Sequence, residues 1–155
     1  MSRGLSNSFL SKISKKILGP QFLGVYPCDV RPKTKNRSCF IIFNTGKKNT
    51  EGEHFVAVKI VKKEIFYFDP FGEQPSNDYI LSFLREEKKN KKFFWNRVQI
   101  QDNSSNFCGF FCLAYLISAK NKMPMKRFKN LFSIQNRKLN DKIVIEFIVS
   151  KIKKK

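Results

Sequence analysis

The sequence predicts an α+β fold, and three observations support this prediction. The 155 residues suit a single domain, 1–155, with one core, and 41% hydrophobic content with 17 Phe is typical of a globular protein. Runs rich in aromatic and β-branched residues, typical of strands, lie between segments whose apolar residues recur at helical spacing. The predicted order is a helix, several strands, a helix, a strand and then helices, which favours α+β.

The first helix is predicted over about residues 5–18, where apolar residues recur at helical spacing and lysines occupy the other face. Gly19 and Pro20 are typical of a helix end. Strands are predicted at 22–26 (FLGVY) and 39–43 (CFIIF), with a basic loop between them.

A polar loop, TGKKNTEGE, leads to two more predicted strands, 54–61 (HFVAVKIV) and 64–69 (EIFYFD). Lys62 and Lys63 join these strands, so we expect a hairpin. The proline and glycine of DPFG then end this part of the sheet.

The second half is predicted to be mainly helical. Residues 79–84 have a helical pattern that runs into a charged segment, and RVQIQ (97–101) alternates like a strand. CGFFCLAYLISAK (108–120) indicates a buried helix. C-terminal helices are expected within about 124–152, the first of them through MKRFKNLF (125–132) with Pro124 in its first turn. The β-branched residues of KIVIEFIVSKI leave helix and strand both open, and we favour a helix.

The charge and hydropathy of the chain restrict the kinds of partner that it can have. The net charge of +19, from 31 Lys+Arg and 12 Asp+Glu, predicts salt-dependent, sequence-independent attraction to polyanions such as DNA. The abundance of Lys, Asn, Ile and Phe also fits an A/T-biased genome. Apolar runs are shorter than the roughly 18 residues of a membrane span, and the basic N-terminus lacks a secretory signal pattern. We therefore expect an intracellular protein without membrane contact.

The cysteines indicate thiol chemistry. They lie at positions 28, 39, 108 and 112, without a C-x-x-C pair and with one histidine in the chain. This pattern argues against structural zinc, so no metal is expected, and free thiols are favoured over disulfides.

His54 is the single histidine, so any Cys/His catalysis has to use it as the base. It begins a predicted strand after a glycine-containing loop, a suitable place for a residue that projects into a cleft. Asp69 ends the next strand and, in a hairpin, returns close to His54, where a carboxylate can fix the imidazole tautomer. Each residue alone is also common in a purely structural role.

Cys108 follows a polar turn and opens the apolar helix. Free N–H groups and the positive dipole end at a helix N-terminus stabilise a thiolate, the nucleophilic form, and can help to bind an oxyanion. Gly109 leaves room for a substrate carbonyl. Cys112, one turn deeper, is interpreted as a core residue.

Gln101 ends a predicted strand seven residues before Cys108. Its side-chain amide can donate to a developing oxyanion. Gln99 points to the opposite face of that strand and is the weaker candidate.

Together, GPQFLGVY, CFIIFNTG, EGEHFVAVKI, FYFDPFG and QDNSSNFCGFFC resemble the adenovirus endopeptidase (adenain) family of adenovirus-like viruses and virus-like transposons. The resemblance covers about two thirds of the chain and includes the His, Asp, Cys order. It implies the adenain-like cysteine peptidase fold, related to SUMO-specific proteases, with a central mixed sheet and the nucleophile at the N-terminus of a buried helix. It also implies a triad of Cys108, His54 and Asp69, within residues 54–112, and an oxyanion donor at Gln101.

The resemblance implies a cysteine endopeptidase that matures viral capsid and core precursors, cleaving after glycine in small-residue motifs, in the host nucleus and the virion. It implies DNA and a viral peptide as activating partners, and we expect a monomer. Phe55 stands where the family usually has Trp. The segment KKNKKFFWNRVQI lacks the cysteine through which the best-known members bind their activator, so a non-covalent peptide is expected.

Two other functions are weighed against this one. A peptidase that removes ubiquitin-like modifiers would use the same residues, but GPQFLGVY, the NTG segment and the small size argue against it. A basic nucleic-acid packaging protein without catalysis would explain the charge, but the His, Asp and Cys arrangement argues against it.

Overall fold

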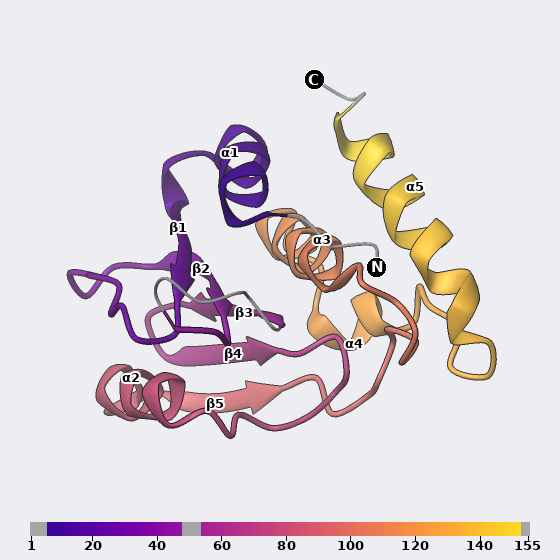
Figure 1. Cartoon of the computed structure of the whole chain (residues 1–155). Helices are drawn as coiled ribbons and strands as arrows, with labels where there is room; N and C mark the ends of the chain where they lie inside the picture. The colour runs from indigo at the N-terminus through magenta and orange to yellow at the C-terminus, as the bar shows by residue number, and fades with distance from the viewer. Residues whose placement is uncertain (1–5, 48–53, 153–155) are drawn as a thin grey trace.

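The computed structural model describes residues 6–47 and 54–152, which form a five-stranded mixed sheet with helices on both faces (Figure 1). The strands lie in the sheet in chain order: β1 (Phe22–Pro27), β2 (Cys39–Asn44), β3 (Phe55–Ile60), β4 (Glu64–Phe68) and β5 (Lys92–Trp95). The β1–β2 and β4–β5 pairs are parallel, and β2–β3 and β3–β4 are antiparallel. The α+β fold with a central mixed sheet is therefore confirmed.

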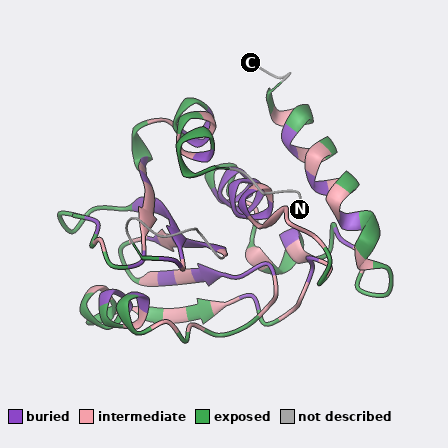
Figure 2. Ribbon diagram, in the orientation of Figure 1, coloured by how far each residue is buried: buried purple, intermediate pink, exposed green. Residues whose placement is uncertain are grey.

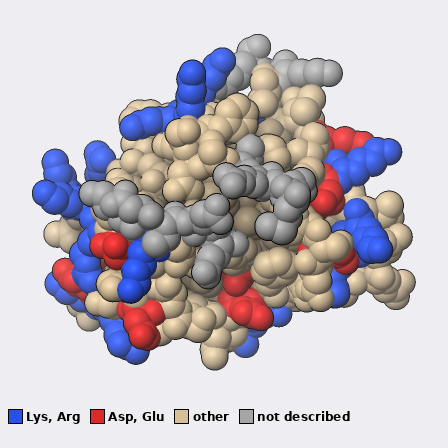
Figure 3. Space-filling model, viewed as in Figure 1, with Lys and Arg blue, Asp and Glu red and all other residues tan. Residues whose placement is uncertain are grey.

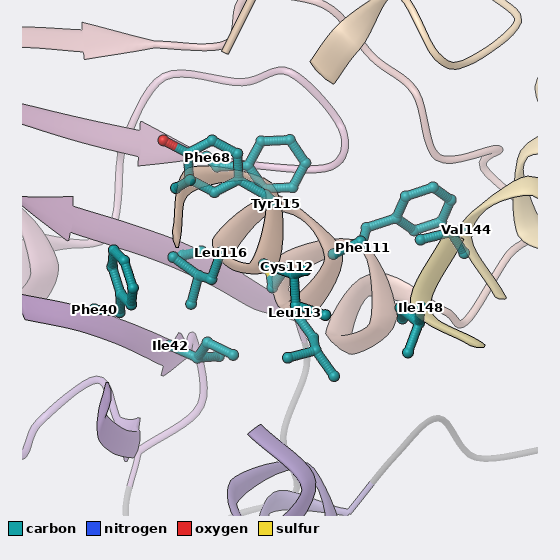
Figure 4. Packing of buried hydrophobic residues seen from close by; sticks show 14 of the residues in the cluster. Phe40, Ile42, Phe68, Phe111, Cys112, Leu113, Tyr115, Leu116, Val144 and Ile148 are labelled. Carbon is teal, nitrogen blue, oxygen red and sulfur yellow. The ribbon is translucent and has the colours of Figure 1, made fainter. Parts of the chain in front are cut away.

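The central helix α3 (Cys108–Lys120) lies on one face of the sheet, and nearly all of its residues are buried. Around it pack α1 (Asn7–Leu18), α4 (Met125–Lys129) and α5 (Asn140–Ile152). Figure 4 shows residues of α3 between strand side chains, such as Ile42, and α5 side chains, such as Val144. A helix that is apolar all round is buried in this way, as the sequence predicts for this segment.

The opposite face is covered by α2 (Asp78–Lys88), whose buried side chains form a second apolar cluster with the sheet. In this cluster Phe43 and Phe83 meet edge to face with their centroids 5.3 Å apart. Every residue of β2 is buried, because its alternate side chains enter the two clusters. Figure 2 shows this burial in the strands and the exposed outer sides of α2 and α5.

Several predicted elements agree with the structure. Helix α1 begins after Ser6, whose hydroxyl accepts from the Phe9 N–H at 3.2 Å, and ends before Gly19, which has φ 77°. A short 3-10 helix (Gly19–Gln21) follows, and another (Arg137–Leu139) precedes α5. The predicted hairpin is formed by β3 and β4. The start of the first helix at residue 5, and positions 48–53 of the polar loop, lie outside the described residues.

The predicted strand at 97–101 is wrong, because β5 lies earlier, at Lys92–Trp95. The chain leaves the sheet at Arg97, where φ is 60°, a backbone conformation that an extended strand does not use. The charged segment accommodates β5 because Phe93 and Trp95 face the α2 cluster while Phe94 stacks on Phe66 on the other side.

Two predicted helix boundaries differ from the structure. Helix α2 continues beyond residue 84 to Lys88, since charged residues are good helix formers on an exposed face. Helix α4 ends at Lys129 instead of covering the apolar residues up to 132. The last element is a helix, α5, and not a strand.

Candidate active site

His54 and Asp69 lie at the same end of the β3–β4 hairpin. His54 directly precedes β3 and Asp69 directly follows β4, and the antiparallel pairing of Ala57 with Phe68 brings the two together. The Nε2 of His54 lies 2.7 Å from the Oδ1 of Asp69, a hydrogen bond that fixes the orientation of the imidazole. The carbonyl of His54 also accepts from the N–H of Thr45 at 2.8 Å.

Asp69 is held rigidly by the chain around it. Its side chain is buried, and its Oδ1 accepts a second hydrogen bond from the N–H of Phe71 at 2.8 Å. The amide of Asn96 donates to the Asp69 carbonyl at 2.6 Å and accepts from the Asp69 N–H at 3.0 Å. Asn96 is fully buried. Its role could not be predicted from the sequence, because a single Asn after a strand gives no local signal of it.

Cys108 is the first residue of α3 and is partly exposed, while the ring of His54 is nearly buried. Since Nε2 of His54 bonds Asp69, Nδ1 is the ring nitrogen left for Cys108. Burial lowers the pKa of His54, but hydrogen bonds to Asp69 and Cys108 and the negative charges of both raise it to about 9 overall. The protonated form of His54 is therefore favoured at neutral pH.

The ring of Phe71 covers one face of His54. The two rings stack at 24° with their centroids 4.8 Å apart. Because the Phe71 N–H bonds the same Oδ1 as His54, one residue supports the His54–Asp69 pair through both its backbone and its side chain. The DPFG motif was the available signal for this residue, although by itself the motif predicts only the end of the sheet.

Cys112 lies one turn deeper in α3 and is fully buried. Burial, with the charges of Cys108 and Asp69, raises its pKa well above the usual value of a thiol. Cys112 therefore stays protonated, which suits a core residue and not a nucleophile. The four cysteines are all free thiols, and Cys28 and Cys39 are also buried.

Gln101 lies in the loop that leads into α3 and is 1% exposed. Its Nε2 donates to the carbonyl and the hydroxyl of Ser105, at 3.0 and 3.3 Å. Its Oε1 is buried without a hydrogen-bond partner among the described residues. Gln99 instead donates to the Gln101 carbonyl at 2.9 Å and to Asn103 at 2.7 Å. Gln101 thus reaches the loop before the nucleophile, with its amide nitrogen held by Ser105.

One turn connects the two halves of the site. The carbonyl of Pro70, next to Asp69, accepts from the N–H groups of Ile100 and Gln101, at 2.9 and 3.0 Å. Gly72 has φ 74°, and a Cβ there would lie 2.5 Å from the carbonyl carbon of Val98. The backbone of the DPFG turn therefore packs directly on the segment that carries Gln101.

The described part of the chain contains no group of three or more His, Cys, Asp or Glu residues that could hold a metal ion. A helix long and apolar enough to cross a membrane is likewise absent from residues 6–47 and 54–152.

Comparisons with known proteins identify the family and the fold. A family model described as adenovirus endoprotease matches residues 22–154. Curated protein sequences gave no match. A crystal structure of the ASFV pS273R protease is similar over 92% of this chain and 65% of its own, with 15% identity and a TM-score of 0.66. A selenomethionine structure of that protease is similar over 65% and 41%, with 17% identity and a TM-score of 0.52. The chain spans less than two thirds of that protease, and at these identities the likeness shows the fold alone.

Proposed function

The chain belongs to the adenovirus endoprotease family of cysteine peptidases, and we propose that it is an endopeptidase with Cys108, His54 and Asp69 as its triad. The observation that carries the proposal is the placement of the single histidine. Its ring bonds Asp69 at 2.7 Å, and Cys108, at the start of a buried helix, contributes with Asp69 to the raised pKa of the ring. A nucleophile, a base and an orienting carboxylate in this order are what thiol peptide hydrolysis requires.

In the proposed mechanism, the Sγ of Cys108 attacks the scissile carbonyl carbon, and the carbonyl electrons move to oxygen. The N–H of Cys108 and the amide of Gln101 donate to this oxyanion. The imidazolium of His54 gives its proton to the leaving amine, and an acyl-thioester remains. Neutral His54 then takes a proton from the water that attacks the thioester, and carboxylic acid and thiolate are released. Asp69 keeps the Nε2 proton in place throughout.

The Gln101 assignment adds a condition to this mechanism. Both of the contacts of Nε2 are with Ser105. The amide has to share one N–H between those two acceptors, or release one of them, to donate to the oxyanion.

For substrates we propose viral capsid and core precursors cut after glycine in small-residue motifs, in the host nucleus and the virion. Family membership supports this choice over removal of ubiquitin-like modifiers. The test compares a panel of precursor-derived peptides with modifier fusions, using Cys108→Ala as the inactive control. Cleavage of precursor peptides alone is expected, and cleavage of the fusions alone would contradict the proposed substrate class.

DNA is proposed as a partner because of the net charge of +19. Figure 3 shows lysine and arginine side chains in several separate groups on one face, which suits a diffuse electrostatic attraction. Binding should be strong at low salt and fall by several orders of magnitude over a modest salt range, for about six phosphate contacts. Absent binding at low salt would contradict this proposal.

A viral activator peptide, if used, is proposed to bind a monomeric enzyme without a disulfide. Cys28 and Cys39 are buried, so neither is accessible for a mixed disulfide in this structure. A reducing agent should preserve or raise activity by keeping Cys108 as a thiol. An enzyme that needs oxidation and carries a peptide on Cys28 or Cys39 in mass spectra would contradict this.

A further inference from the structure

The loop between Gln101 and Cys108 is fastened by the first two residues of α5, more than thirty positions later in the chain. The amide of Asn140 donates to the Ile100 carbonyl at 2.6 Å and to the Ser133 carbonyl at 2.8 Å, and accepts from the Ser133 N–H at 2.8 Å. Asn140 is fully buried, so these bonds form away from water, where an unpaired amide is costly. The start of the loop is thereby fixed to α5.

Asp141 fixes the middle of the same loop. Its Oδ1 lies 2.7 Å from the hydroxyl of Ser105. An ionised carboxylate accepts hydrogen bonds and cannot donate, so the single hydroxyl proton of Ser105 points at Asp141. The hydroxyl oxygen is then left as an acceptor for its other neighbours, the N–H of Phe107 at 3.1 Å and the Nε2 of Gln101 at 3.3 Å.

This direction of donation adds a second acceptor to the Ser105 carbonyl that already faces the Gln101 amide. Both Ser105 atoms near it, the carbonyl and the hydroxyl oxygen, are acceptors, so the amide has to present its nitrogen and not its oxygen. Without the carboxylate, the Ser105 hydroxyl could rotate and donate to Oε1 of a reversed amide, and the Ser105 carbonyl alone would still favour the nitrogen. In a reversed amide the oxygen would stand where the nitrogen now is. That oxygen could not donate a hydrogen bond to the oxyanion and would repel it.

We propose that Asp141, acting through Ser105, is a positioning residue for the oxyanion site: it sets the orientation of the Gln101 amide and of the first turn of α3. The inference rests on the proposed function, because it assigns a task within that reaction. Asp141 also lies in the first turn of α5, where a carboxylate stabilises a helix. The test therefore has to separate positioning from helix stability.

The experiment measures peptide hydrolysis and Cys108 alkylation by iodoacetamide in Asp141→Asn and Ser105→Ala. Alkylation uses the thiolate but forms no oxyanion. We expect kcat to fall about 10- to 100-fold with KM nearly unchanged, part of the loss that removing one oxyanion donor causes. The alkylation rate should stay at the wild-type value, and Ser105→Thr, which keeps the hydroxyl, should restore most of kcat.

Glu146→Gln is the matched control, because it also neutralises an acidic side chain of α5. Glu146 is exposed, and its ion pair with Lys142 is long, at 4.0 Å. It should leave the rates of hydrolysis and alkylation unchanged.

Hydrolysis by Asp141→Asn and Ser105→Ala within twofold of wild type would overturn this inference but not the proposed function. Equal losses of hydrolysis and alkylation would also overturn it, since they indicate a loosened α3. The proposed function, and this inference with it, would be overturned if the wild-type chain cleaves no peptide and its Cys108 is alkylated no faster than in His54→Ala.

Discussion

The two halves of the candidate site are built in different ways. His54 and Asp69 flank two antiparallel strands, so the strand register places them opposite each other. Gln101 lies in an irregular segment, which is held by side chains from elsewhere, among them Asn140 and Asp141. A site can thus combine a part fixed by backbone pairing with a part fixed by buried polar contacts, and each part should respond differently to substitution.

The largest expected effect comes from the reacting groups themselves. Cys108→Ala and His54→Ala should each lower kcat/KM by about 10⁴-fold or more, because the chain has no second histidine and Cys112 is buried. Peptide hydrolysis with purified, folded variants measures this. Cys112→Ala serves as the control and should retain activity. Loss in Cys112→Ala with activity in Cys108→Ala would mean that the other thiol is the nucleophile.

Substitution of Asp69 tests the strand-anchored half. Asp69→Asn keeps the side-chain shape but allows the amide to donate, which disfavours the required imidazole tautomer. We expect kcat to fall by roughly 10² to 10⁴-fold while some turnover remains. The pH profile of kcat/KM should shift as well, since Asp69 raises the pKa of His54. An unchanged rate in Asp69→Ala would remove this residue from the triad.

Gln101→Ala tests the loop-anchored half. Loss of one oxyanion donor typically lowers kcat about 10² to 10³-fold. Alkylation of Cys108 by iodoacetamide should proceed at the wild-type rate, in contrast to His54→Ala, in which alkylation should slow. If Gln101→Ala cleaves peptides normally, the backbone N–H of Cys108 supports the oxyanion without it.

The smallest expected effect is on stability. The folded-state pKa of His54 is raised to about 9 from 6.5, so protonation favours the folded state. The contribution is complete below about pH 6.5 and is lost as pH rises to about 9, and it amounts to up to about 3 kcal/mol. Urea unfolding of wild type and His54→Gln at pH 6 to 9.5 measures it. The stability gap between the two should narrow with rising pH, and a constant gap would contradict the raised pKa.

The same contrast explains what the sequence could predict. Strand pairing and the start of α3 follow from local patterns, so the sequence could predict that Asp69 returns close to His54 and that Cys108 opens a buried helix. The catalytic roles of these three residues stay a prediction. The contacts of Asn96 with Asp69, and of Asp141 with Ser105, join positions that are 27 and 36 residues apart. No spacing rule connects such pairs, because they depend on how the elements pack.

The position of β5 was missed for a related reason. Residues 97–101 alternate as well as any strand, but the pairing partner β4 selects Lys92–Trp95. Alternation of apolar and polar residues indicates only that a segment can form a strand. The contacts of Phe93 and Phe94 with side chains of the sheet favour residues 92–95 as the partner of β4.

The turn at Pro70 and Gly72 has a consequence for the precision of the site. It is covalently continuous with Asp69, and its backbone bonds and touches the segment of Gln101. A thermal displacement of this turn carries the carboxylate and the amide in the same direction. The distance between the Asp69 carboxylate and the Gln101 amide should therefore vary less than it would if the two segments moved independently.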